Sequence, residues 1–187
     1  PHIRNLPSNT TITGQAIQPP DWDGRPANAR GWFADVEGCA VCEIYGMRNG
    51  GVLEQKAADI IREQTGLPVV CACELFSGLA SLERAASAVL NAGLLPITQD
   101  FIHAVRRAFE ERGIHAEILI VRSDSSLMGL AYSAEHAVET LLSGPAASAL
   151  GGSALTGREN AVVVDIGGTT TDVALIENSA PLLAEGG

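Results

Sequence analysis

A short stretch near the end of the chain carries residue types that bind phosphate: Asp165-Ile-Gly-Gly-Thr-Thr-Thr-Asp172. Its glycines allow the backbone to come close to an anion with N–H groups directed inward, and its threonines add hydroxyl donors. A plain hairpin turn would not require an aspartate on each side. We therefore predict a phosphate-binding turn whose contacts come from Gly167, Gly168, Thr169 and Thr170.

The two aspartates that flank this turn have different predicted roles. Asp165 ends an apolar, strand-like run and offers the hard carboxylate oxygen that Mg²⁺ or its bound water prefers. We expect Asp165 to be the catalytic residue and the metal ligand, either holding Mg²⁺ through water or orienting a nucleophile. Asp172 opens the next run, and we expect it to hold the hairpin or a metal-bound water.

Two other polar stretches are weaker candidates for substrate contacts. Arg122 and Asp124 follow a predicted strand, where open α/β sheets usually bind ligands, although a solvated loop explains them as well. Ser143 and Gly144 precede Pro145, and a helix N-terminus with proline at its first position accounts for them equally. The four histidines are scattered along the sequence, so we predict no ligand cluster from them.

The four cysteines form two close pairs, Cys39–Cys42 and Cys71–Cys73. A CxxC pair is a common half-site for zinc, but the second pair has CxC spacing. Both pairs lie in apolar runs that resemble strands, in which residues three apart point to opposite faces. We therefore favour free cysteines that pack as small hydrophobic residues in a reducing compartment over a zinc-stabilised structural domain.

After an irregular arm over residues 1–35, with a short strand near 10–16, the apolar pattern predicts alternating strands and helices. Strands are expected at 38–45, 68–73 and 116–122, the last central and parallel because it is mostly apolar. Helices are expected at 53–65, from Ser81 to Gly113 with a kink or division at Pro96, from Ser133 to about 142, and from Pro145 to Gly157.

In the long helix the expected buried stripe is Leu82, Ala85, Ala86, Val89 and Leu90. The alternation of strands and helices indicates an α/β layer with a mostly parallel sheet and flanking helices.

The pattern changes after residue 160 to three short strands, at 161–165, 171–176 and 181–184, joined by tight turns. We interpret them as an antiparallel β-meander that opens a second lobe. Three strands without a covering helix cannot bury both faces, so this unit is expected to be incomplete. The predicted division is an arm at 1–35, the rest of a first α/β lobe at 36–158, and the start of a second lobe at 159–187.

The phosphate-binding hairpin is similar to that of the actin-like ATPases, a superfamily that includes sugar kinases and heat-shock chaperones. The pairing of Glu139-Thr-Leu-Leu-Ser-Gly-Pro-Ala-Ala147 with Val162-Val-Val-Asp-Ile-Gly-Gly-Thr-Thr-Thr-Asp172 resembles the hydantoinase/5-oxoprolinase family in particular. Supporting stretches are Glu83-Arg-Ala85, Val89-Leu-Asn-Ala92, Leu95-Pro-Ile97 and Ser126-Leu-Met128. The resemblance covers nearly the whole chain and is weakest before residue 35.

The resemblance implies two RNase H-like lobes that close over ATP and Mg²⁺. It also implies ATP-dependent opening of a cyclic amide such as 5-oxoproline or a hydantoin, with phosphoryl transfer to the amide oxygen before water opens the ring. Relatives use the same module for carboxylation, so an ATP-binding carboxylase subunit is an alternative, as is a non-catalytic regulatory module. The expected partners are the rest of the same polypeptide, a second hydantoinase-type subunit and a small cyclic amide.

The chain departs from the family pattern at two points. Relatives carry another DxGGT-like phosphate loop at the start of the first lobe, and none lies upstream here, so we expect the chain to begin inside the first lobe and to end inside the second. Relatives often have histidine before the glutamate that opens the first helix, where this chain has Val52-Leu53-Glu54. A catalytic role of that histidine does not carry over.

Composition narrows the classes of protein further. The formal charge is −10, with an isoelectric point near 4.7 and no cluster of lysine and arginine, which argues against a nucleic-acid or anionic-membrane surface. The chain is 46% hydrophobic, yet it has no apolar run long enough to span a bilayer. We expect a globular protein that works in the cytoplasm.

Overall fold

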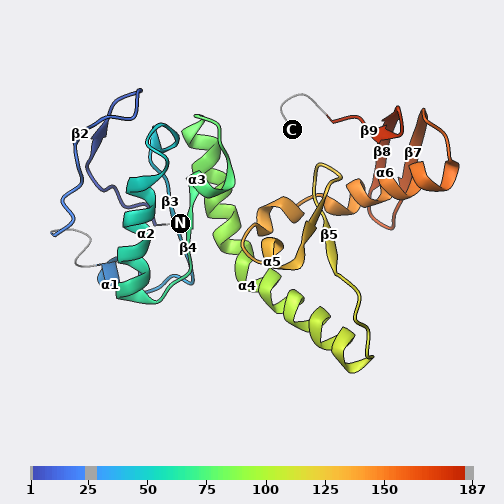
Figure 1. The fold of residues 1–187 in the computed structure, drawn as a ribbon, viewed down its shortest axis with the longest axis horizontal. Coiled ribbons are helices and arrows are strands. Elements are labelled where there is room, and N and C mark those ends of the chain that lie inside the picture. The colour runs from blue at the N-terminus through green and yellow to red at the C-terminus, as the bar shows by residue number, and fades with distance from the viewer. Residues whose placement is uncertain (1, 24–28, 184–187) are drawn as a thin grey trace. The chain divides into compact units, whose positions relative to one another are not determined.

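The computed structural model describes residues 2–23 and 29–183, and the chain divides into two units, Pro1–Leu95 and Pro96–Gly187 (Figure 1). The boundary falls within helix α4, Ser81–Glu111. Residues 24–28 of the expected arm, and the expected third meander strand from residue 184 onward, lie outside the described residues. The predicted division at residues 35 and 158 stays a prediction about the whole protein.

The first unit contains one parallel pair of strands. β3 (Cys39–Val41) runs beside β4 (Val69–Cys71), with Cys39 opposite Val69. Both strands are shorter than the sequence predicted. The chain leaves β3 for a 3-10 turn, η2 (Gly46–Arg48), and passes from β4 directly into α3 (Ala72–Leu75), because polar contacts described below hold both exits in place.

The expected irregular arm contains short regular elements. A hairpin of β1 (Asn9–Thr10) and β2 (Ala16–Gln18) occupies the region of the predicted short strand, and α1 (Ala29–Trp32) follows. In the described part of the chain, no helix combines the length and the apolarity that a membrane span requires.

Helix α2 (Val52–Thr65) confirms the helix predicted at 53–65. Gly51 and Gly66 flank it with φ angles of 74° and 72°, a left-handed conformation that glycine adopts without strain. The Gly66 N–H donates to the Arg62 carbonyl at 2.8 Å and so closes the last turn. The buried core beneath α2 consists of Cys39, Ala58, Val69 and Cys71, with Phe33, Val41, Ile61 and Cys73 packed around it.

The long helix α4 is continuous through Pro96, so of the two outcomes expected there, a kink or a division, the division does not occur. Proline removes one backbone hydrogen bond, but a long helix tolerates that loss when its flanking turns are intact. The predicted buried stripe is also wrong, since Leu82 is 82% exposed. The residues of α4 that are buried are Arg84, Ala88, Asn91, Ala92, Leu95 and Ile102.

In the second unit, the expected central parallel strand is instead part of an antiparallel hairpin. β5 (Leu119–Val121) pairs with β6 (Leu127–Gly129). The turn between them is fixed by Asp124, whose Oδ1 accepts hydrogen bonds from the Ser126 N–H at 2.9 Å and the Ser126 hydroxyl at 2.6 Å. Such a turn reverses the chain where a parallel strand would need a crossover.

The helix predicted from Ser133 to about 142 is wrong as well. A single turn, α5 (Leu130–Ser133), ends where that helix was expected to begin, and a 3-10 turn, η3 (Ala137–Thr140), follows. Helix α6 (Ser143–Thr156) then ends at Gly157, as predicted, with a φ of 61° at that glycine. Its N-cap is Leu142, with a φ of 60°, rather than Ser143, so Pro145 is the third helical residue.

The predicted meander is confirmed. β7 (Ala161–Ile166), β8 (Thr171–Glu177) and β9 (Ala180–Pro181) form an antiparallel sheet in that order. Across the described residues the strands form four small sheets, of which only the β3–β4 pair is parallel. The single mostly parallel sheet expected from the sequence is therefore not observed, although the chain is of the α/β class.

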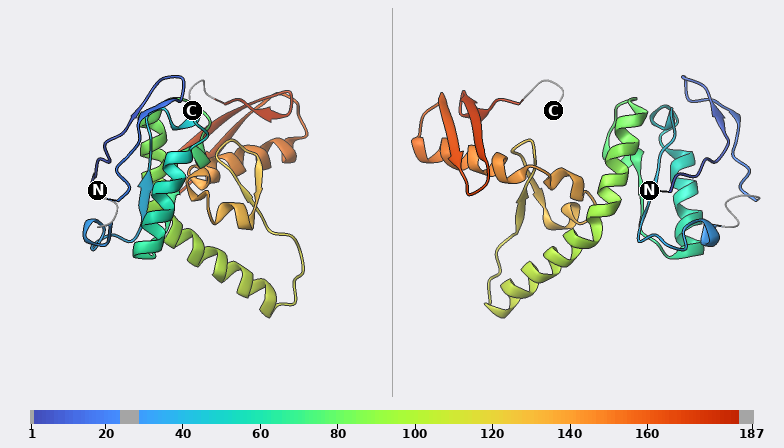
Figure 2. Two further views of the ribbon diagram at one scale, coloured as in Figure 1. Left: turned by 60° about the vertical axis from the view of Figure 1, so that its left-hand side comes forward. Right: turned by 180° about the vertical axis from the view of Figure 1, so that it is seen from behind.

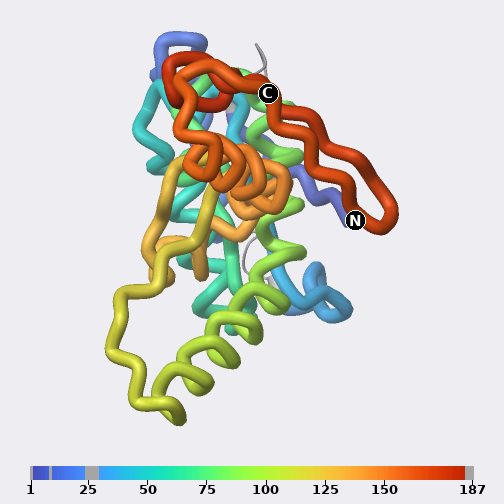
Figure 3. Tube along the Cα trace, turned by 90° about the vertical axis from the view of Figure 1, so that its right-hand side faces the viewer, coloured from blue at the N-terminus to red at the C-terminus, as the bar shows by residue number. Residues whose placement is uncertain are grey.

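One face of the meander is covered, contrary to the expectation that no helix covers it. Helix α6 lies along β7 and β8 (Figure 2). Its residues are mainly alanine, glycine and serine, which lets its backbone approach the sheet closely. The opposite face of the two strands exposes Val162, Val164, Ile166, Val173 and Leu175. Figure 3 follows the β7–β8 hairpin from the side, with the connecting turn at its tip.

We predict that packing between α6 and the sheet depends on Gly152. A Cβ atom built there would lie 2.6 Å from Cγ1 and 2.7 Å from Cγ2 of Val163, so rotation of the valine cannot clear both atoms. Gly152→Ala should lower the free energy of unfolding by about 1–3 kcal/mol in urea titrations. Gly151→Ala, whose Cβ meets nothing within 4 Å, should leave it unchanged or raise it slightly. Equal effects of the two substitutions would contradict this packing.

Candidate functional site

The predicted phosphate-binding turn joins β7 to β8. Within it the Gly167 N–H donates to the Thr170 carbonyl at 2.9 Å, and residues 167–170 are all exposed. The pairing of the two strands continues up to Ile166 and Thr171, which lie opposite each other. The hairpin geometry that the sequence predicted for this stretch is thus confirmed, with residues 167–170 exposed at its tip.

The two glycines of the turn serve different steric purposes. Neither has a positive φ, so the backbone conformation alone does not demand glycine. A Cβ on Gly167 would lie 3.2 Å from the Thr170 carbonyl oxygen, so a side chain there would crowd the turn. A Cβ on Gly168 would meet nothing within 4 Å. The absence of a side chain at Gly168 therefore leaves open space beside the turn, which a ligand could occupy.

Asp165 and Asp172 face each other across the hairpin. They are direct register partners, so their side chains lie on the same face of the sheet. Like charges placed directly opposite each other are destabilising. None of the four ion pairs described for the chain includes either aspartate. The pair is thus a place where a cation would relieve repulsion.

These carboxylates fit Mg²⁺ that arrives with a phosphate ligand. In the described residues no group of three or more His, Cys, Asp or Glu side chains could hold a metal ion by itself. Mg²⁺ in phosphate-transferring sites commonly uses one or two carboxylates, phosphate oxygens and several waters. The donor set of Asp165 and Asp172 matches that pattern, whereas it is too small for a dedicated protein cage.

Sequence analysis missed Ser148, which contacts the site from α6. Its hydroxyl donates to Oδ2 of Asp165 at 2.5 Å. The contact joins residues 17 positions apart, and no local pattern identifies such a pair. Only the packing of α6 on β7 brings them together.

The predicted residues Ser143 and Gly144 lie at the same end of the sheet as the turn. Along α6, Ser148 is opposite Asp165 and Gly152 is opposite Val163, so the helix begins at the end where β7 finishes. The first N–H groups of a helix carry partial positive charge. Because Ser143 and Gly144 are the first two residues of α6, their backbone amides contribute to that charge.

The other predicted substrate residues have structural partners of their own. Arg122 forms an ion pair through Nε with Glu139, and its NH1 donates to the Ser126 hydroxyl at 3.2 Å. The Ser126 hydroxyl and N–H hold the pKa of Asp124 below its usual value. The contacts described for Arg122 and Asp124 thus tie the β5–β6 turn to η3. They do not bring these residues to the turn at 167–170.

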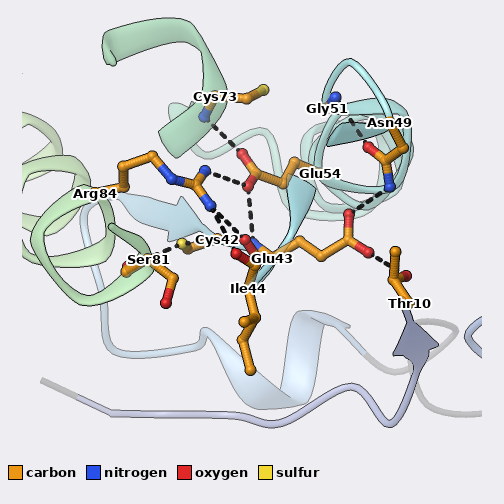
Figure 4. Close-up of polar contacts among 10 residues, drawn as sticks. All are labelled: Thr10, Cys42, Glu43, Ile44, Asn49, Gly51, Glu54, Cys73, Ser81 and Arg84. Carbon is orange, nitrogen blue, oxygen red and sulfur yellow. Dashed lines mark hydrogen bonds and ion pairs between the residues drawn. The ribbon is translucent and has the colours of Figure 1, made fainter. Parts of the chain in front are cut away.

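A second polar cluster, also missed by sequence analysis, lies in the first unit (Figure 4). Glu54 and Arg84 are each only 1% exposed and pair at 3.2 Å. The Glu54 carboxylate also accepts hydrogen bonds from the N–H groups of Glu43 at 2.8 Å and Cys73 at 2.7 Å. One carboxylate therefore binds the chain just after β3, just after β4, and on α4.

Arg84 completes this cluster. Its NH2 donates to the carbonyls of Glu43 at 2.6 Å and Ile44 at 3.3 Å. The Glu43 side chain in turn accepts from Thr10 and Asn49, which connects the arm and η2 to the cluster. The carboxyl ends of parallel strands are where open α/β sheets usually bind ligands, but here this buried ion pair fills that place.

The signal for this pair was present in the sequence. Glu54 shares a helical face with Ala58 and Ile61, and Arg84 shares one with Ala88 and Asn91, at spacings of four and three residues. A charge of opposite sign on each of two buried faces indicates a partner across the core.

Three of the four cysteines belong to the core beneath α2 or pack against it. Cys39 and Cys71 are buried, Cys73 is half-buried and Cys42 is exposed. Burial raises the pKa of Cys71 and of Cys73 to about 12, and the nearby Glu54 carboxylate adds to the effect at Cys73. Zinc binds the thiolate form, which this environment disfavours. The packing interpretation therefore accounts for the cysteines better than the zinc hypothesis.

Comparison with known proteins identifies the family. The chain resembles about a quarter of one acetone carboxylase structure and of one caprolactamase structure, and the family model described as Hydantoinase/oxoprolinase matches residues 84–185. The chain belongs to the hydantoinase/oxoprolinase family. The match includes α6, the predicted phosphate-binding turn and Arg84.

Three matches, one by sequence and two by structure, illustrate the similarity. The chain is 30% identical over 146 residues to the caprolactamase subunit alpha of Pseudomonas jessenii, covering 75% of this chain and 20% of that protein. It resembles the nucleotide-free structure of acetone carboxylase, with a TM-score of 0.80, 25% identity and coverage of 95% and 26%. It also resembles the crystal structure of the ATP-dependent caprolactamase from Pseudomonas jessenii, with a TM-score of 0.78, 26% identity and coverage of 92% and 26%. The chain spans about a fifth to a quarter of the length of these relatives.

We predict that the Glu54–Arg84 pair is required for the stability of the first unit. Glu54→Gln keeps the shape of the side chain but leaves the Arg84 charge buried without its counter-charge, which should lower the free energy of unfolding by about 3–5 kcal/mol. The double variant Glu54→Leu/Arg84→Met should lose less than the sum of its single variants, because it leaves no buried charge.

Asp59→Asn serves as the control in the same urea titrations. Asp59 pairs with Arg62 at an exposed position, so its loss should change the free energy of unfolding by at most about 0.5 kcal/mol. A loss in Glu54→Gln no larger than that of the control would contradict the importance of the buried pair.

Proposed function

We propose that this chain contributes part of the nucleotide site of an ATP-dependent enzyme that opens cyclic amides. The observation that carries the proposal is the arrangement at the β7–β8 turn. Two aspartates face each other across an exposed glycine- and threonine-rich turn, and no cationic side chain is described as pairing with either. Mg²⁺ with nucleotide phosphates supplies both the cation and the anion that this arrangement fits.

The proposed roles follow from where each residue lies. The backbone and hydroxyl groups of Gly167, Gly168, Thr169 and Thr170 would contact phosphate oxygens. Asp165 would hold Mg²⁺ through water or orient the attacking group, and Asp172 would hold a second metal-bound water. The first amides of α6, at Ser143 and Gly144, would add positive potential at the same end of the sheet. Arg122 and Asp124 are proposed substrate contacts at the β5–β6 turn.

ATP, when bound, would supply a phosphoryl group to the amide oxygen and so make the amide carbon more electrophilic. Water could then add there, the C–N bond could break with nitrogen leaving as the amine, and hydrolysis of the acyl phosphate could release phosphate. The contribution of the chain would be to position the phosphates and to neutralise their charge. The protein would act in the cytoplasm, where ATP is available and free cysteines stay reduced. The finer architecture we propose is that of RNase H-like, actin-like lobes, completed by the rest of the polypeptide and working with a second hydantoinase-type subunit.

Cyclic-amide hydrolysis is favoured over carboxylation by the curated relative that reaches 30% identity, a caprolactamase subunit. Carboxylation is the second candidate, because the structure of acetone carboxylase matches 95% of the chain at a TM-score of 0.80. A regulatory ATPase module without a substrate of its own is the third.

We predict that one cyclic amide from a panel of 5-oxoproline, hydantoins and caprolactam is the substrate. Its addition should increase the rate of ATP hydrolysis by the full-length polypeptide. Asp165→Asn should lower the stimulated rate by about 10²–10³-fold without lowering the thermal midpoint, because it removes charge at the phosphates and one side of the repulsion with Asp172 but no packing. Asp59→Asn should retain the wild-type rate. Stimulation by a ketone with bicarbonate instead would favour the carboxylase, and a normal rate in Asp165→Asn would contradict the role of Asp165.

We predict that Gly168→Ala weakens binding of MgATP about tenfold or more in calorimetric titrations while leaving the urea midpoint unchanged. The added methyl group meets no atom within 4 Å in this chain, so only a ligand at the turn would encounter it. Gly78→Ala is the matched control, since its Cβ is equally unobstructed and it lies in the other unit. If Gly168→Ala bound MgATP with unchanged affinity, the proposal that the phosphates bind at this turn would be contradicted.

A further inference from the structure

The contact between Ser148 and Asp165 points to a residue that acts on the site without being part of the turn. We propose that Ser148 is a positioning residue, whose hydroxyl fixes the Asp165 carboxylate so that its other oxygen, Oδ1, faces the divalent cation that accompanies the nucleotide. This inference rests on the proposed function.

The hydrogen bond itself is of the strong kind. The distance of 2.5 Å between Ser148 Oγ and Asp165 Oδ2 lies at the short end of the range for a hydroxyl that donates to an ionised carboxylate. Asp165 is exposed, and an exposed aspartate side chain otherwise samples several rotamers. A bond to one carboxylate oxygen selects one of these rotamers and leaves the other oxygen to face outward.

The donor is held rigidly by its helix. Ser148 and Gly152 are one helical turn apart on the face of α6 that lies against the sheet, and Gly152 packs directly on Val163. Ala146, two residues before Ser148, and Ala149, directly after it, are 8% and 3% exposed. The hydroxyl therefore approaches Asp165 from a backbone that is fixed by packing on both sides.

The position of Asp172 explains why Asp165 needs such a contact. The two aspartates are register partners on one face of the hairpin, so their mutual repulsion drives the Asp165 carboxylate away from Asp172. A hydrogen-bond donor on α6 opposes that displacement without adding a positive charge. A lysine in its place would compete with the cation, whereas a serine leaves the negative charge of both aspartates available to it.

The test compares Ser148→Ala with Ser148→Thr in the full-length polypeptide, using calorimetric titration of ATP at several Mg²⁺ concentrations and with Mg²⁺ removed by a chelator. Ser148→Ala should raise the Mg²⁺ concentration needed for half-maximal ATP binding by about tenfold. Its affinity for ATP without metal should equal that of the wild type. Ser148→Thr keeps the hydroxyl and should restore the wild-type Mg²⁺ dependence.

Ser153→Ala is the control, because it removes a hydroxyl from the same helix five residues further from the turn. It should leave the Mg²⁺ dependence unchanged. A Ser148→Ala protein with wild-type Mg²⁺ dependence, or one that loses ATP affinity equally with and without metal, would overturn the positioning role alone. A wild-type protein that binds no MgATP would overturn the proposed function and this inference together.

Discussion

The contact between α6 and the β7–β8 hairpin is the constraint on which the candidate site depends. Val163 occupies the space left by the missing side chain of Gly152, and this fixes how far along the sheet the helix lies. With that register set, Ser148 meets Asp165 and the helix begins beside the glycine-rich turn. The two aspartates, the turn and the positive end of the helix then occupy one end of the sheet, where phosphate and a divalent cation are both favoured.

The first unit depends on a different interaction, the buried pair of Glu54 and Arg84. The pair matters to stability mainly through what its loss would cost, since a buried charge without its partner strongly destabilises the fold. The pair holds the chain segments that leave β3 and β4, because Glu43 and Cys73 both donate to Glu54. The carboxyl ends of the parallel strands are thereby closed by side chains of the chain itself, and the candidate nucleotide site lies in the other unit.

The features that sequence analysis predicted correctly are those specified locally. The hairpin from Asp165 to Asp172 and the end of α2 at Gly66 follow from turn residues adjacent in sequence. The wrong predictions concern elements whose orientation or pairing is determined by a polar side chain or by a residue distant in sequence. Arg84 turns the buried face of α4 away from its apolar stripe, because Glu54 lies across the core. Asp124 folds β5 back into a hairpin through bonds to Ser126, which hydrophobic periodicity does not report.

The central claim is that the turn at 167–170 holds nucleotide phosphates together with a divalent cation. The most direct measurement is methyl NMR of the threonine-labelled full-length polypeptide with Mn²⁺ in place of Mg²⁺, since Mn²⁺ takes the same oxygen ligands and broadens nearby signals. The account predicts that Mn²⁺ with ATP broadens the methyl signals of Thr169, Thr170 and Thr171 more strongly than that of Thr65 in α2. Broadening that spares those three methyl groups while ATP is bound would contradict it.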